Sequence, residues 1–74
     1  MDLASCAVGV DVEVVGLLTP PDAHLRMHEV GLRLGSVVRV TQLAPFGGRV
    51  VAVGTSRIAV DGATATRIEV RASR

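Results

Sequence analysis

Residues 8–15 read VGVDVEVV, and this stretch decides the fold class because valine recurs at every second position. Successive side chains of a strand point to opposite faces, so a period of two predicts a strand with one buried face, at about residues 10–18. Pro20 and Pro21 end this strand, since proline lacks the N–H group that a sheet ladder requires.

Turn residues divide most of the remaining chain into four further short strands. Alternating and β-branched residues place them at about residues 36–44, 49–53, 57–61 and 68–70. A helical turn is expected from Gly62 through Thr66. Short strands separated by glycine and proline predict a mainly β protein, a small and partly open barrel of about five strands in which curling shields the strand edges.

One short α-helix is expected over residues 23–30, between the first two strands. Ala23, Met27 and Val30 fall on one helical face, and Gly31 suits the left-handed residue that often follows a helix. Residues 1–7 are interpreted as a short lead-in and 72–74 as a tail. The 74 residues leave room for a single domain with one core.

The composition argues against several classes of function. Eight arginines against seven acidic residues give a net charge of +1, which is too balanced for a nucleic-acid binder. Phe46 is the only aromatic residue, so the chain lacks stacking platforms for single strands and aromatic grooves for proline-rich peptides. The chain shows neither a signal peptide nor a membrane-spanning run, and its single cysteine, Cys6, suits a reducing compartment. These features predict a cytoplasmic protein that does not insert into a membrane.

The sequence also predicts that the chain is not an enzyme. Its carboxylates are scattered, and no serine or cysteine nucleophile has a base at a recognisable spacing. The glycines at 31, 35, 47 and 48 follow a helix or join strands, whereas a phosphate-binding loop opens a helix. We therefore interpret them as turn residues.

Two histidines are the candidate metal ligands. His24 and His28 are four residues apart on the expected helix, so both imidazoles lie on one face and could share Fe²⁺ or another divalent metal. No third ligand stands at motif spacing, and two ordinary surface histidines are the favoured alternative. We expect no required cofactor.

Candidate docking residues lie around the end of the expected helix and in the turn between the strands expected at 36–44 and 49–53. Near the helix the candidates are Leu25, Arg26, Leu32 and Arg33. Exposed leucines beside arginines are typical of a docking patch, but scattered apolar residues are also normal on a protein surface, and both interpretations stay open. Phe46 would either anchor a partner or fold back to cap the barrel. Folding back is the expected outcome.

The order of these motifs resembles the FeoA family over roughly residues 8–71. The segments concerned read EVGLRLG at 29–35, VRV at 38–40, APFGG at 44–48, IAVD at 58–61 and IEV at 68–70. Three positions depart from the family pattern: Leu34 and Arg49 stand where proline is usual, and Asp61 where a basic residue is common. The last departure reverses a charge on a surface that could contact a partner.

The resemblance implies an SH3-like barrel and an accessory role in bacterial ferrous-iron uptake. The implied partner is FeoB, a membrane transporter with a cytosolic GTP-binding domain, bound through protein–protein contact. The same barrel occurs as the C-terminal domain of DtxR-type repressors, so a metal-sensing domain is the alternative. A homo-oligomer formed through an unpaired edge strand is a third reading.

Overall fold

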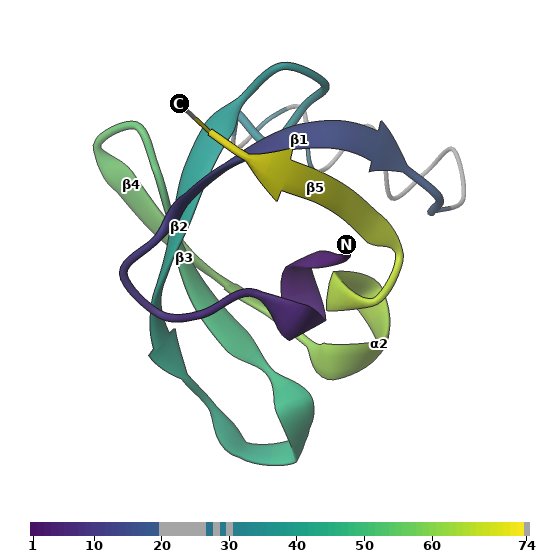
Figure 1. Cartoon of the computed structure of the whole chain (residues 1–74). Coiled ribbons are helices and arrows are strands. Elements are labelled where there is room, and N and C mark those ends of the chain that lie inside the picture. The colour runs from purple at the N-terminus through teal and green to yellow at the C-terminus, as the bar shows by residue number, and fades with distance from the viewer. Residues whose placement is uncertain (20–26, 28, 30, 74) are drawn as a thin grey trace.

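Five antiparallel strands form the body of the protein, as the valine alternation predicts. The computed structural model describes residues 1–19, 27, 29 and 31–73. The strands are β1 (Asp11–Leu17), β2 (Val37–Leu43), β3 (Arg49–Val53), β4 (Ser56–Val60) and β5 (Ile68–Ala72). Their order across the sheet is β4-β3-β2-β1-β5 (Figure 1).

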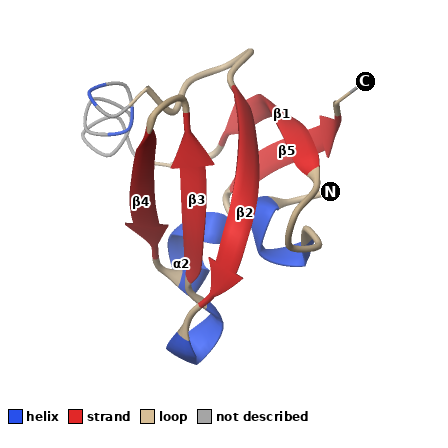
Figure 2. Ribbon diagram, turned by 90° about the vertical axis from the view of Figure 1, so that its left-hand side faces the viewer, coloured by secondary structure: helices blue, strands red, loops and turns tan. Residues whose placement is uncertain are grey.

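The sheet bends so strongly that its two halves become separate layers. β2, β3 and β4 lie in one layer, and β1 and β5 lie behind it (Figure 2). The register shifts between Val14 and Gly16 in β1 and between Val40 and Gln42 in β2, and such bulges bend a strand. The predicted mainly β class is confirmed, and within the described residues the sheet stays open because β4 and β5 are its edges.

The core lies between the two layers and is built mainly from valine. The inward faces of the five strands supply Val12, Val14, Val38, Val40, Val51, Val53, Val60, Ile68 and Val70, each at most 8% exposed. No charged or polar side chain is buried among the residues that the structure describes. The hydrophobic effect on the alternating strands therefore supplies most of the stability.

Helical elements with bounds in the described part of the chain are η1 (Leu3–Ser5), η2 (Pro45–Gly47) and α2 (Gly62–Ala65). η1 and α2 lie side by side in the opening of the bent sheet (Figures 1 and 2). Leu3 and Ala65 are both completely buried there. The expected lead-in is thus part of the core, and Asp2 adds a bridge to Glu69 of β5.

The remaining predictions agree with the structure to within one or two residues where it describes them. β5 extends to Ala72, which pairs with Val12, so the expected tail begins one residue later. Most of the predicted helix at residues 23–30 lies outside the described residues; Met27 and Glu29 are helical. No helix in the described part of the chain is long and apolar enough to cross a membrane.

Candidate functional site

The structure describes two of the four docking candidates that the sequence placed around the expected helix, Leu32 and Arg33. Leu32 has no exposed surface and packs in the core, so the expectation that it forms part of a docking patch is wrong. Arg33, next to it, is exposed. The other candidates of this region, for docking and for metal, lie outside the described residues: His24, Leu25, Arg26 and His28.

Phe46 points into solvent. Its relative exposure is 102%, the highest of the large apolar residues described, so the expectation that it caps the barrel is wrong. The physical reason is the backbone conformation: Phe46 has φ 59° and ψ 34°, in the left-handed region that residues other than glycine rarely adopt. The inner side of the turn is meanwhile occupied by the backbone at Gly62.

The turn that carries Phe46 is closed by its own hydrogen bonds. The Ala44 N–H donates to the Gly48 carbonyl at 2.9 Å, and the Gly48 N–H donates to the Pro45 carbonyl at 3.2 Å. Gly47 follows Phe46 with φ 80°, so two successive residues are left-handed. Proline at the first helical position and glycine at the second left-handed position suit this geometry.

Arg49 fastens the turn to the N-terminal segment. Its Nη1 donates to the carbonyls of Gly47 at 2.8 Å and Gly48 at 3.0 Å, and its Nη2 donates to the carbonyl of Ala4. Guanidinium donors are charged, so these hydrogen bonds are stronger than neutral ones. Sequence reasoning missed this residue; the only signal was an arginine where the resembled family usually has proline.

The start of α2 supports the turn from the other side. A Cβ atom on Gly62 would lie 2.8 Å from the Phe46 carbonyl oxygen, so only glycine allows this approach. Asp61 caps α2 by accepting from the Thr64 N–H at 2.7 Å, and this hydrogen bond lowers the pKa of Asp61. The acidic residue at this position therefore has a local structural role.

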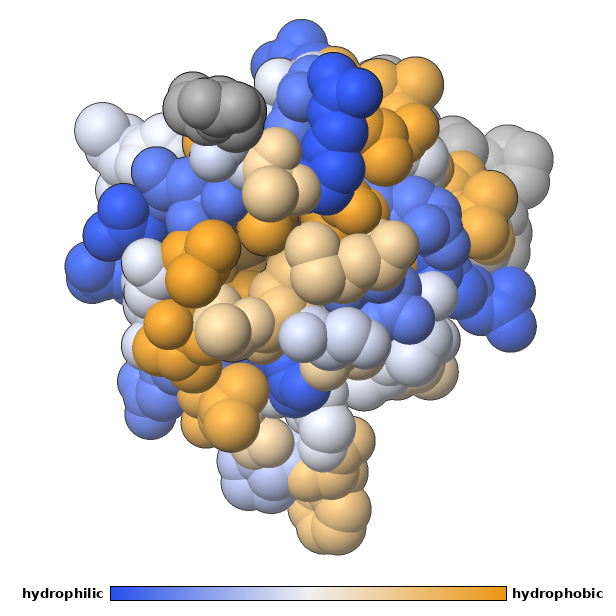
Figure 3. Space-filling view, viewed as in Figure 1, coloured by the Kyte–Doolittle hydropathy of each residue, from blue (hydrophilic) through white to orange (hydrophobic). Residues whose placement is uncertain are grey.

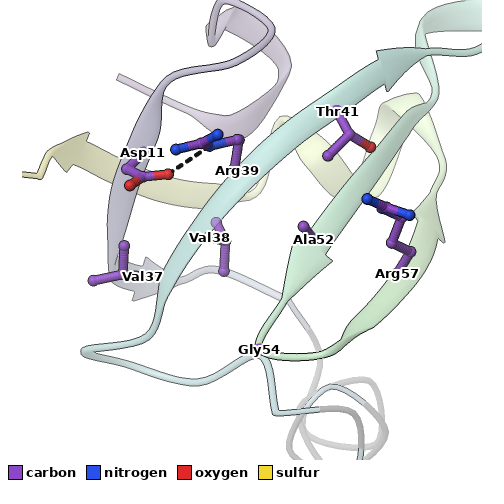
Figure 4. A pocket seen from close by; sticks show the side chains of 8 residues that line it. All are labelled: Asp11, Val37, Val38, Arg39, Thr41, Ala52, Gly54 and Arg57. Atoms are coloured by element: carbon purple, nitrogen blue, oxygen red, sulfur yellow. Dashed lines mark hydrogen bonds and ion pairs between the residues drawn. The ribbon is translucent and has the colours of Figure 1, made fainter.

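A shallow groove of about 400 Å³ lies on the outer face of the sheet (Figure 4). Ala52 lies in it, and Arg57 lies at one side. At the other side the Arg39 Nε donates to Asp11 Oδ1 at 2.7 Å, which lowers the pKa of Asp11 and raises that of Arg39. This pair is exposed and satisfied, so the groove offers no cluster of converging acids and bases for catalysis.

The remaining reactive groups of the described residues do not form a site either. Burial, reinforced by the charge of Asp2, raises the pKa of the Cys6 thiol, which is only 7% exposed. Such a thiol is a poor nucleophile. Among residues 1–19, 27, 29 and 31–73, no group of three or more His, Cys, Asp or Glu side chains could hold a metal ion.

Three solved structures share this fold over almost the whole chain. Iron(II) transport protein A from Clostridium thermocellum is 26% identical with a TM-score of 0.88, and the match covers 97% of this chain and 45% of that one. This chain thus spans less than half of that relative's length. FeoA from Chlorobium tepidum is 24% identical with a TM-score of 0.91, over 100% of this chain and 71% of that one.

The third structure is FeoA from Stenotrophomonas maltophilia in complex with zinc, a prokaryotic SH3 domain protein. It is 33% identical with a TM-score of 0.72, over 96% of this chain and 89% of that one. No curated protein sequence matches the chain. The sequence model of the FeoA domain matches residues 1–72, nearly the full length. The chain is therefore an SH3-like member of the FeoA family.

Proposed function

We propose that this chain is a non-catalytic, cytoplasmic accessory protein of bacterial ferrous-iron uptake that binds the cytosolic region of a FeoB-like membrane transporter. Membership of the FeoA family supports the link to iron. The C. thermocellum relative is named an iron(II) transport protein. The S. maltophilia relative is a candidate activating factor of ferrous-iron transport.

One observation carries the proposal of action by docking. The described interior is filled with valine and leucine and contains no buried polar side chain, whereas an aromatic side chain stands fully exposed on a braced turn. A packed apolar core offers no chemistry, while exposed aromatic residues are typical of the centres of protein interfaces. The outer surface is therefore the part that acts.

Direct binding to the transporter tests the proposal. The full-length FeoB-like transporter of the same organism, reconstituted in nanodiscs, is titrated with the full chain while binding is followed by biolayer interferometry. We expect saturable binding with a Kd of about 1–50 μM, as is usual for a small transient interface. Absence of binding over this range, with a transporter that still hydrolyses GTP, would contradict the proposal.

A second measurement separates docking from an effect on transport. Fe²⁺ uptake into proteoliposomes that contain the transporter is followed with and without the chain. We expect the uptake rate to change at the concentrations at which the chain binds. Binding without any change in uptake would limit the function to docking.

A further inference from the structure

We propose that Phe46 is the anchor of this interaction and inserts into an apolar pocket on the cytosolic region of the transporter. This inference rests on the proposed function and assigns it to one end of the molecule. η2 extends beyond the ends of β2 and β3 in Figure 2. In Figures 1 and 3, which share one view, this end of the molecule projects below the body of the protein.

The protein bears two unfavourable features at a single residue, Phe46. Its only aromatic side chain stands fully in water, and the same residue adopts a left-handed backbone conformation. Glycine at this position would remove both features. Strained conformations that persist in a fold are concentrated at functional sites, because the surrounding structure holds them in place.

The backbone that carries Phe46 is braced by neighbouring residues although the Phe46 side chain is free. Arg49 binds the carbonyls of Gly47 and Gly48, and Gly62 packs against the Phe46 backbone so closely that no Cβ atom would fit. An anchor whose backbone is already held in place loses less freedom when it binds than one carried by an unsupported loop. The turn is thus preorganised for insertion.

The segment that carries Phe46, residues 43–48, is uncharged and mostly apolar. Residues 43–48 read LAPFGG and carry no charge, and Leu43 is 57% exposed beside the turn. The nearest basic residue, Arg49, directs its guanidinium to main-chain carbonyls of the protein itself. A complementary partner surface is therefore an apolar pocket that needs no charge where it meets residues 43–48.

A protein pocket fits this tip better than a lipid surface does. Stable attachment to a membrane needs more apolar area than one ring supplies, or added basic residues that bind anionic headgroups. Residues 43–48 provide no basic side chain. A pocket can bury the whole ring of Phe46 and the adjoining Leu43, so it removes more exposed apolar surface from water than a lipid surface would.

The test compares matched variants of the full chain against the same transporter nanodiscs. Phe46→Ala removes the ring, Phe46→Trp keeps an aromatic anchor, and Leu34→Ala removes another exposed apolar side chain (62% exposed) at the opposite end of β2. We expect Phe46→Ala to raise Kd by about tenfold or more. Phe46→Trp should stay within about threefold of the wild-type Kd because it keeps an aromatic ring, and Leu34→Ala should do so because it lies outside the anchor.

The outcomes distinguish this inference from the proposed function. Wild-type binding with an unchanged Kd for Phe46→Ala overturns the anchor and leaves docking intact. Loss of binding in Leu34→Ala alone moves the interface to the opposite end of β2 and also overturns it. Equal binding to empty nanodiscs of the same lipids would assign the ring to the membrane instead. No binding by the wild type overturns both proposals, and unchanged circular dichroism and Tm show that each variant is folded.

Discussion

The guanidinium of Arg49 donates a hydrogen bond to the main-chain carbonyl of Ala4, 45 residues away along the chain. The same group holds the two carbonyls that follow Phe46 in the β2–β3 turn. One side chain therefore connects the N-terminal segment, the first residue of β3 and the exposed turn. Its contribution can be measured separately from the hydrophobic core.

Replacing Arg49 with methionine should lower the free energy of unfolding by about 2 kcal/mol, since several carbonyls lose charged donors. Arg49→Lys keeps the charge but loses the forked geometry, so roughly half of the loss should remain. Urea denaturation followed by circular dichroism measures both. Arg57→Met is the control, because Arg57 is exposed at the edge strand and its replacement should change stability little. Equal losses at the two positions would contradict the role of Arg49.

Truncation of Leu3 tests whether the N-terminal segment belongs to the core. Leu3 is completely buried against α2 and β5, so Leu3→Ala should destabilise the protein by about 2–4 kcal/mol. Leu18→Ala, at a residue that is 62% exposed, should have a far smaller effect. Thermal unfolding of the two variants decides the matter, and a Leu3→Ala protein as stable as the wild type would be inconsistent with the structure.

The left-handed conformation of Phe46 predicts an unusual gain in stability. Phe46→Gly should raise the free energy of unfolding by about 0.5 kcal/mol, because release of strain exceeds the added freedom of the unfolded chain. At the next position Gly47→Ala should lower it by about 1 kcal/mol, since φ is 80° there. Urea denaturation of both variants gives the two values. A loss in Phe46→Gly would mean that the ring makes stabilising contacts.

The cap of α2 predicts a dependence of stability on acid. The Thr64 N–H holds the folded-state pKa of Asp61 below its unfolded value. The resulting stabilisation is fully present above the unfolded value, near pH 4, and is lost as the pH falls through the folded value. Asp61→Asn keeps a capping oxygen without titrating, so its Tm should fall less than that of the wild type between pH 6 and pH 2.5. Parallel slopes of Tm against pH would contradict this assignment.

The strands could be predicted from the sequence because their signal is local. Valine at alternate positions requires only that one face be buried, and glycine and proline mark where each strand stops. The N-terminal turn was missed because residues 1–7 show no periodicity. Leu3 is buried because α2 and β5, which are distant in sequence, pack against it. The local sequence around Leu3 therefore cannot predict its burial.

The candidate site was harder to predict for the same reason. APFGG at residues 44–48 identifies a turn, but it does not specify on which side of the turn the ring lies. That direction depends on Gly62, which fills the inner side, and on the φ of Phe46. Leu32 was likewise assigned to the surface although it completes the core, because its position in a loop gives no period from which to judge burial.

The burial of Cys6 has a practical consequence for labelling the β2–β3 turn. The chain has a single thiol, and burial keeps it protonated and shielded at neutral pH. A cysteine introduced at an exposed position of the β2–β3 turn would react with maleimide or spin-label reagents well before Cys6 does. Fluorophores and cross-linkers can therefore be attached to one chosen spot on the otherwise natural chain.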